Sequence, residues 1–401
     1  MKIAVVGAGI TGLTTAYRLS QKNYKVVVFE KEKFPGGLAA GFKKENWDWS
    51  VEYFFHHLFT SDQSAKKLIS ELNLSARLFY SRPKTSIFYQ GKISQFDSPI
   101  NLLFFPHLNF PEKIRAALAT AYLKMANNWQ KLEKISAWDW LISAYGKWPF
   151  RILWQPLLQG KFGKQAKKIS AAWFWARIKR RSTKLGYLRG GFQVLVNQLL
   201  EKIKENGGQI ILDHEVKNLK ELKDFDRIII TTPTEKFFKT NLPPMLGAIN
   251  LILILKDQFL TDGTYWLNIN EPNFPFVAVV EHTNFVDSKH YGGERILYVG
   301  GYYPQNHCYF GMNPREILLE FLPFLKKINK KFDNSSITNY ELRISKFAQP
   351  IMVLNYSKIL SELKRSLPKN IYLANMQTIY PWDRGVNYAI DQGEKVANEI
   401  P

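Results

Sequence analysis

The amino-acid sequence predicts an α/β protein of about two domains. Its 401 residues exceed what a single hydrophobic core usually organises, since most domains contain roughly 100 to 200 residues. At the N-terminus, continuous apolar runs at residues 2–6 and 26–29 flank a segment with helical spacing at 13–22. Apolar strands joined by a helix are typical of a parallel sheet that is covered on both faces. We therefore expect the chain to open with a Rossmann-type βαβ unit.

After residue 62 the pattern changes to a mixture of helices and alternating strands. We first expect a helix at about 63–73, a β-hairpin at 85–96 and helices across 110–180. A Gly-Gly turn and a helix should follow within 187–206, with strands near 209–212 and 226–233. Alternating strands over about 248–302, a helix at about 314–331, and a closing strand and helix within 371–400 complete the expected order. The sequence thus predicts two discontinuous domains. The domain built on the parallel sheet comprises residues 1–75, 185–240 and 368–401, and an inserted α+β domain for the substrate comprises 76–184 and 241–367.

Composition is that of a soluble globular protein from a reducing compartment. The hydrophobic fraction is 46% and the charged fraction is 22%, close to the averages for such proteins. Cys308 is the only cysteine, which excludes a disulfide framework and a cysteine-rich zinc site. The first residues already form a strand rather than a secretory signal, and no apolar run is long enough to cross a membrane. We expect a cytoplasmic protein.

The net charge of +21 bears on the partners of the protein. A surface this basic attracts phosphates, nucleic acid or anionic lipid headgroups. Lys, Asn and Ile are abundant along the whole chain, so we attribute most of the excess to overall composition and expect no nucleic-acid partner. Peripheral contact with an anionic membrane, at its inner face, stays an alternative.

A glycine fingerprint follows the first strand. Gly7, Gly9 and Gly12 are spaced as GxGxxG at the start of the first helix, and Glu30 ends the second strand. In this pattern the first glycine permits a tight turn, the second lets the backbone approach a pyrophosphate, and the third lets helix and strand pack closely. The helix N-terminus offers free N–H groups to the phosphates, and the acid accepts hydrogen bonds from a ribose. We expect dinucleotide binding rather than a purely structural turn.

Three further segments carry a family resemblance. KEKFPGGLAAGF at 31–42, YLRGGFQVLVNQL at 187–199 with HEVKNL at 214–219, and YLANMQTIYPWDRGVNYAIDQG at 372–393 resemble the FAD-binding segments of the amine oxidase, protoporphyrinogen oxidase and phytoene desaturase superfamily. The resemblance implies an FAD cofactor held by Gly7, Gly9, Ile10, Thr11, Gly12, Glu30, Lys31, Gly36, Gly37, Leu38, Val216, Asn375, Asp383, Arg384, Gly385, Val386 and Asn387.

The sequence departs from this superfamily at two positions. Leu38 stands where many members have Arg, and Asn375 stands where many have an acid. Asn375 would hydrogen-bond the pyrophosphate or the ribityl chain without adding charge. No second GxGxxG occurs, so no separate NAD domain is expected.

The paired histidines His56 and His57 lie in FHHLFTSD, which is similar to the segment that runs beneath the isoalloxazine in UDP-galactopyranose mutases. If residues 51–59 are extended, adjacent side chains point to opposite faces, which argues against one metal ion between the two; no metal site is expected. The resemblance implies that one histidine lines the flavin pocket as a hydrogen-bond donor or proton relay. Packing of a buried, hydrogen-bonded histidine is the competing interpretation.

Two charged segments are candidates for contacts with a substrate or the flavin. Arg177, Arg180 and Arg181 follow helical spacing with Lys184, on a face expected to lie opposite Trp173. Such a face would bind a diphosphate, lie on anionic lipid or simply be solvated. Asp383, Arg384 and Gly385 precede the last helix, whose N-terminus would face the flavin, although Asp383 could equally cap that helix.

The sequence therefore predicts an FAD-dependent oxidoreductase of the oxidase or desaturase type. It would remove a hydride or two electrons from a small molecule, anionic or hydrophobic, bound between the two domains, with the flavin carrying the electrons. Two alternatives stay open. One is a mutase-like flavin-dependent isomerase of a nucleotide sugar, and the other is a flavoprotein without catalytic activity.

Overall fold

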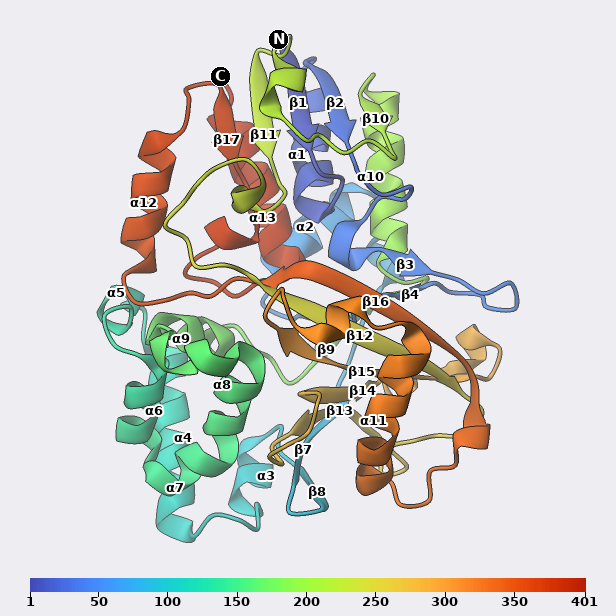
Figure 1. Ribbon diagram of the computed structural model, residues 1–401, viewed down its shortest axis with the longest axis vertical. Coiled ribbons are helices and arrows are strands. Elements are labelled where there is room, and N and C mark those ends of the chain that lie inside the picture. The colour runs from blue at the N-terminus through green and yellow to red at the C-terminus, as the bar shows by residue number, and fades with distance from the viewer.

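The computed structural model describes residues 1–401 as three packed regions (Figure 1). A parallel sheet with helices on both sides lies at the top of the view, beside both chain ends. A helical region lies at the lower left, and a larger, mainly antiparallel sheet lies at the lower right. The expected α/β architecture is confirmed.

The parallel sheet has five strands in the order β10-β2-β1-β11-β17. Its strands are β1 (Lys2–Val6), β2 (Lys25–Phe29), β10 (Gln209–Ile211), β11 (Arg227–Ile230) and β17 (Ile371–Leu373), and every neighbouring pair is parallel. Three helices cover one face: α1 (Ile10–Ser20), α10 (Gln193–Glu205) and α13 (Val386–Glu399). All five strands lie within the ranges expected for this domain, while the exact domain boundaries stay a prediction.

Strand β1 shows why its sequence is a continuous apolar run. Ile3 and Val5 belong to the core beneath α1 and α13, whereas Ala4 and Val6 belong to a second core that includes residues of α9 (Ala171–Lys179) and α12 (Tyr356–Ser366). All four side chains are at most 5% exposed. Because both faces of the sheet are covered, no position on the strand favours a polar residue.

The second sheet has seven strands in the order β16-β12-β15-β14-β13-β7-β8. They are β7 (Lys84–Tyr89), β8 (Lys92–Gln95), β12 (Leu246–Leu255), β13 (Thr264–Ile269), β14 (Ala278–Glu281), β15 (Arg295–Tyr303) and β16 (Ile337–Gln349). Neighbours are antiparallel except for β13 and β7. Helix α11 (Pro314–Ile328) packs on one face, and Asn313 and Glu316 form a capping box at its start.

The helical region contains α3 (Pro99–Leu103), α4 (Phe110–Met125), α5 (Trp129–Leu132), α6 (Ala137–Tyr145), α7 (Lys147–Pro149), α8 (Gln155–Phe162) and α9. A π-helical turn at Phe150–Trp154 precedes α8. Helix α2 (Gln63–Glu71) packs beside α13. Short strands complete the chain: β3 (Gly41–Phe42) pairs with β4 (Val51–Glu52), and β9 (Leu185–Leu188) pairs with β5 (Leu58–Phe59) and β6 (Leu78–Ser81).

Two local expectations are wrong. Residues 51–59 are not one strand: β4 ends at Glu52 and β5 begins at Leu58, with a bend between them, so strand alternation does not separate His56 from His57. The basic face is not one helical stripe either. Helix α9 ends at Lys179, and Trp173 lies one turn before Arg177, on the same side of the helix rather than opposite it.

Candidate functional site

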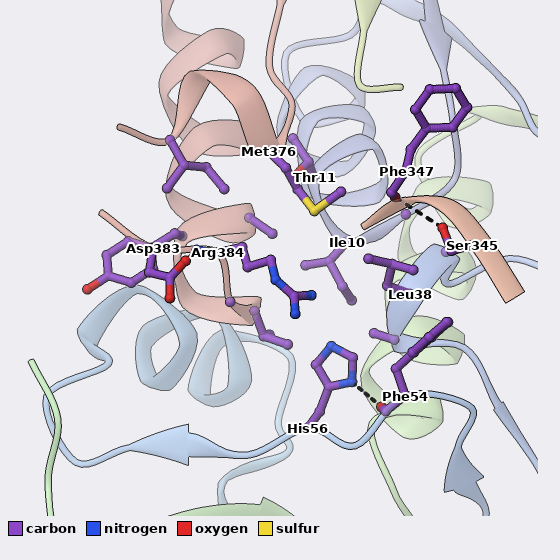
Figure 2. A pocket seen from close by; sticks show the side chains of 18 of the residues that line it. Ile10, Thr11, Leu38, Phe54, His56, Ser345, Phe347, Met376, Asp383 and Arg384 are labelled. Carbon is purple, nitrogen blue, oxygen red and sulfur yellow. Dashed lines mark hydrogen bonds between the residues drawn. The ribbon is translucent and has the colours of Figure 1, made fainter. Parts of the chain in front are cut away.

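A cavity of about 640 Å³ lies between the parallel sheet and the rest of the molecule. Residues at the carboxyl ends of β1, β2 and β11 line one side, and α8, α9, β13 and β16 line the other. Figure 2 shows side chains from α1, from β16, from the segment around His56 and from the segment before α13 around one space. Ligands of open α/β sheets bind outside the carboxyl ends of the strands, so this cavity is where the fingerprint predicts a cofactor.

The GxGxxG glycines form one end of the cavity, and each has a distinct steric reason to be glycine. A Cβ added to Gly12 would lie 1.9 Å from the carbonyl oxygen of Gly7, so the first helix can approach the first strand only without a side chain there. A Cβ on Gly9 would meet no protein atom nearer than 4.0 Å. Gly9 lines the cavity and Gly12 does not. The space beside Gly9 is therefore ligand space, while Gly12 serves packing.

The second glycine pair completes this cradle. Gly36 pairs with Gly9 through a backbone bridge, and its N–H donates to the carbonyl of Ala8 at 2.8 Å. Its φ of +116° lies in a region that side chains disfavour, and a Cβ on Gly37 would lie 3.1 Å from the Gly9 Cα. Leu38 also lines the cavity, as Figure 2 shows.

Glu30 is held at the end of β2 by backbone donors. One carboxylate oxygen accepts from the N–H of Ala8 at 2.7 Å and the other from the N–H of Glu32 at 3.0 Å. The residue is buried but belongs to the cavity wall together with Lys31 and Val216. These contacts fix the acid as an acceptor, with lone pairs left for further hydrogen bonds.

The residues at this end fit FAD. Helices α1 and α13 both begin at the cavity, and neither has a side-chain cap, so their first N–H groups and positive dipole ends stay available to an anion. Gly385 precedes α13, and Val386 and Asn387 lie in its first turn, all three on the cavity wall. An uncapped pair of helix N-termini beside a glycine cradle suits a diphosphate and a flavin ring.

Both histidines line the same cavity, which the sequence did not predict. The Nδ1 of His56 lies 2.6 Å from the carbonyl oxygen of Phe54, so Nδ1 carries the proton and Nε2 is left as an acceptor (Figure 2). His57 lies within 3.4 Å of the Tyr265 hydroxyl. Burial lowers the pKa of His56 to about 4 and, with nearby Arg181, that of His57 to about 3. Both are neutral imidazoles near pH 7.

A cluster of charges forms another part of the cavity wall, next to the start of α13. The carboxylate of Asp383 lies 3.7 Å from both the Lys161 ammonium and the Arg177 guanidinium, and it accepts from the Trp173 indole at 3.1 Å. Burial would raise the pKa of Asp383, but Lys161, Arg177 and Arg384 outweigh it and the pKa lies below its usual value. The acid is therefore ionised, and cations outnumber it.

Lys161 is the most unusual member of this wall. It is 6% exposed, and its ammonium lies 5.1 Å from the Trp173 ring and 5.2 Å from the Tyr302 ring. Burial, together with Arg177 and Arg384, lowers its pKa to about 7, although Asp383 opposes the shift. Lys161 is thus one of two cavity residues whose charge changes near neutral pH; the other is Asp62, whose pKa burial raises to about 6.

Arg384 and Arg181 add fixed positive charge. Arg384 donates from Nε to the Gln349 side chain at 2.9 Å and from Nη2 to the Tyr302 hydroxyl, which orients it at the cavity across from His56 (Figure 2). Burial and Arg177 lower the pKa of Arg181 to about 9, which still leaves it charged at neutral pH.

The outcomes for the remaining basic face are mixed. Arg177, Arg180 and Arg181 all line the cavity, whereas Lys184 is exposed outside it. Arg180 stacks its guanidinium 4.9 Å from the Trp382 ring. Arg177 and Arg181 are therefore turned toward the cavity, whereas Arg180 and Lys184 are exposed.

The side-chain contacts of Asn375 and Asp383 differ from those expected. Asn375 lies outside the cavity wall, because its side chain donates to Thr232 and Thr234 and accepts from the Gln377 N–H. Its side chain links the segments that follow β11 and β17. Asp383 does not cap α13, since the N-cap is Gly385; its side chain instead binds the Arg384 N–H and the cationic wall.

Sequence reasoning missed Lys161 and Tyr302 as functional candidates. Lys161 lies in QGKFGKQAKKISAAW at 159–173, a segment in which no site residue was expected. A lysine among apolar and aromatic residues on a helix was the available signal. Tyr302 carried no signal, because only the fold brings β15 next to α8.

The comparisons with known proteins agree with this site. The family model described as flavin containing amine oxidoreductase matches residues 10–240. The 15-cis-phytoene desaturase of Synechococcus elongatus is 30% identical over 157 residues, which cover 35% of this chain and about a third, 33%, of that protein. None of the helices combines the length and apolarity that a bilayer crossing requires.

Solved structures share the whole fold. A putative protoporphyrinogen oxidase from Exiguobacterium sp. superposes with a TM-score of 0.76 at 15% identity, covering 100% of this chain and 98% of that one. A reduced UDP-galactopyranose mutase gives a TM-score of 0.76 at 16% identity, covering 100% of this chain and 95% of that one. With its matching segment extending from the first helix through the second glycine helix, the chain belongs to the flavin-containing amine oxidoreductase family, an oxidoreductase family whose cofactor is FAD.

Proposed function

We propose that the protein oxidises an anionic small molecule bound against the wall formed by Lys161, Arg177, Arg181, Asp383 and Arg384. The observation that carries the proposal is the charge of this wall: one ionised acid among four basic side chains in a buried setting. An uncompensated buried charge is costly, and an anionic ligand would relieve it.

The glycine end and the cationic end would divide the work. Gly7, Gly9, Gly36 and Gly37 would cradle the FAD diphosphate, with Glu30 accepting from the ribose and Val216 beside the adenine. Bound FAD supplies the chemistry, since it accepts a hydride and returns the two electrons to a separate acceptor. The N-terminus of α13, at Val386 and Asn387, would face the flavin and favour negative charge there.

The remaining residues would position the substrate and exclude water. Arg177 and Arg384 would hold the anionic group, and guanidinium groups suit carboxylate and phosphate because they donate two parallel hydrogen bonds. His56 would accept a hydrogen bond at Nε2. With a pKa of about 7, Lys161 would take up the proton that accompanies hydride loss.

Apolar side chains also line this space, among them Phe55, Leu157 and Trp266. They suit the hydrocarbon body of a substrate that carries its anionic group at one end. Both substrate properties expected from the sequence, anionic and hydrophobic, are then combined in one molecule.

The test is an anaerobic screen of FAD-loaded protein against paired compounds. Each pair consists of a carboxylate or phosphate compound and its neutral ester, with amines and porphyrinogens included. We expect flavin bleaching by an anionic member and at least about tenfold slower bleaching by its ester. Bleaching only by neutral compounds or by amines would contradict the proposal.

A flavin-dependent isomerase of a nucleotide sugar is a second candidate. The same cationic wall supports it, since a sugar-nucleotide diphosphate is an anion of the required kind. The two candidates differ in redox balance. Isomerisation by protein whose flavin has first been chemically reduced, with no net consumption of an electron acceptor, would favour the isomerase over the oxidoreductase.

A further inference from the structure

Helix α4 is apolar on two opposite sides. Ala116, Ala119 and Leu123 are buried against the helical region. The other side is exposed and consists mainly of the large side chains Phe110, Ile114, Leu118, Tyr122 and Met125, which follow helical spacing. A water-facing side of a helix is normally polar. Its apolar character here calls for a partner.

The preceding helix extends this apolar face. Ile100 and Leu103 of α3, and Phe104 directly after it, are also exposed, with Phe104 at 77%. Eight of the fourteen large hydrophobic side chains exposed on the entire protein lie between residues 100 and 125. We call these eight the α3–α4 face. Figure 1 places α3 and α4 at the lower end of the molecule, away from both chain ends. A contiguous apolar surface of this kind marks an interaction site.

The charges around the α3–α4 face are almost all positive. Residues 99–179 contain thirteen Lys and Arg but only three Asp and Glu. Two of the thirteen, Lys161 and Arg177, line the cavity, which leaves eleven basic residues outside it. The only charged residues among the exposed positions of α4 are Arg115 and Lys124. The single acid of α4, Glu112, is bound into a capping box with Asn109. An apolar surface with a basic surround is complementary to phosphate headgroups above an acyl layer.

From this complementarity we propose that the α3–α4 face docks on an anionic lipid surface. Phe104, Leu118 and Met125 enter the boundary between headgroups and acyl chains, and exposed basic side chains around the face contact the phosphates. Arg115 and Lys124 themselves donate to main-chain carbonyls of residues 143, 144 and 181. A second copy of the chain fits less well, because it would bring two regions of the same charge together. The contact stays at the surface, since no helix here is long and apolar enough to span a bilayer.

This inference is independent of the proposed substrate. The basic residues of the cavity face inward from α8 and α9, so lipid contact does not use them. Flavin content therefore reports on the integrity of the cavity and the fold, while vesicle binding reports only on the α3–α4 face.

The test is co-sedimentation of the FAD-loaded, full-length protein with vesicles. One set contains phosphatidylglycerol and phosphatidylcholine in equal parts, and the other contains phosphatidylcholine alone. We expect binding to the first set, weakened by salt, and little binding to the second. Leu118→Glu should lower the affinity roughly tenfold or more, because it puts a charge into the lipid boundary.

A matched control is available on another helix. Leu319 on α11 is 57% exposed, close to the 66% of Leu118. Leu319→Glu should bind vesicles like the unmodified protein, and both variants should retain full flavin. Absence of binding to the anionic vesicles, or equal loss in the two variants, would overturn the proposal. So would a dimer in sedimentation equilibrium that Leu118→Glu dissociates without any vesicle binding, since the face would then serve a second copy.

Discussion

The two ends of the cavity hold charge in different ways. At the glycine end, the positive character comes from uncapped helix N-termini and backbone N–H groups, which are fixed and cannot titrate. At the other end, it comes from side chains such as Lys161 and Arg177 around Asp383. Substitutions at the glycine end should therefore act through steric clashes, and each should either abolish or preserve folding or flavin binding. Substitutions at the other end should act through charge, in a graded and pH-dependent way.

The largest effect should come from the pair Gly12→Val and Gly9→Val. The first places a Cβ 1.9 Å from the Gly7 carbonyl oxygen and should lower the free energy of unfolding by about 3 kcal/mol. The second finds no protein atom within 4.0 Å and should leave the melting temperature of the apoprotein nearly unchanged, yet abolish flavin retention. Thermal melts and visible flavin absorbance of the purified variants check both. A Gly9→Val protein that purifies with its full content of yellow flavin would contradict the placement of FAD against Gly9.

Breaking the charged wall should also destabilise the fold. Asp383→Asn removes the acid between Lys161 and Arg177, whose side chains are at most 18% exposed. Leaving buried cations without their partner should cost about 3 kcal/mol in urea unfolding. Asp391→Asn is the matched control, since Asp391 is exposed and hydrogen-bonds only Ser64; its cost should be below about 0.5 kcal/mol. Equal losses in the free energy of unfolding for the two variants would show that Asp383 stabilises the fold no more than an exposed carboxylate does.

The titration of Lys161 should make substrate binding at the cationic end depend on pH. The folded protein lowers this pKa to about 7, so the ammonium is charged below that pH and is lost as the pH rises through it. The KM for an anionic substrate should therefore rise roughly tenfold between pH 6 and pH 8.5. Lys161→Arg should keep the KM low across that range, and Lys161→Met should keep it high at every pH. If the pH dependence of KM is unchanged in Lys161→Met, another residue must be the group that titrates.

The smallest effect should come from the histidines. With pKa values near 4 and 3, His56 and His57 stay neutral from pH 6 upward and contribute hydrogen bonds rather than protons. His56→Asn and His57→Asn should keep the flavin bound and slow its reduction by no more than about tenfold, less than the loss of a general acid or base would cause. Stopped-flow reduction checks this, and a loss near a thousandfold in either variant would restore a catalytic proton transfer.

The glycine end could be predicted from the sequence because it is local. Gly7 to Gly37 lie within one βαβ unit, and each has a steric task that spacing alone reveals. Of the cationic wall, the sequence indicated Arg177, Arg181, Asp383 and Arg384 as separate candidates. Lys161, and the meeting of these residues on one wall, could not be predicted, because Asp383 lies more than 200 residues along the chain from Lys161 and Arg177.

Local errors had local causes. The bend after Glu52 put His56 and His57 on one cavity, although an aromatic run is typical of a strand. The basic stripe was drawn too long because charge spacing does not reveal that α9 ends at Lys179. Asn375 was assigned to the cofactor by resemblance, whereas its amide is used up within the protein.

The most direct test of the account is a titration of the FAD-loaded protein with pyrophosphate, an inert anionic probe, followed by the perturbation of flavin absorbance. We predict a saturable perturbation whose affinity falls as the pH rises through about 7, and which is roughly tenfold weaker in Arg177→Gln. No perturbation, or equal affinity in the unmodified protein, Arg177→Gln and Lys161→Met, would contradict an anion site beside the flavin.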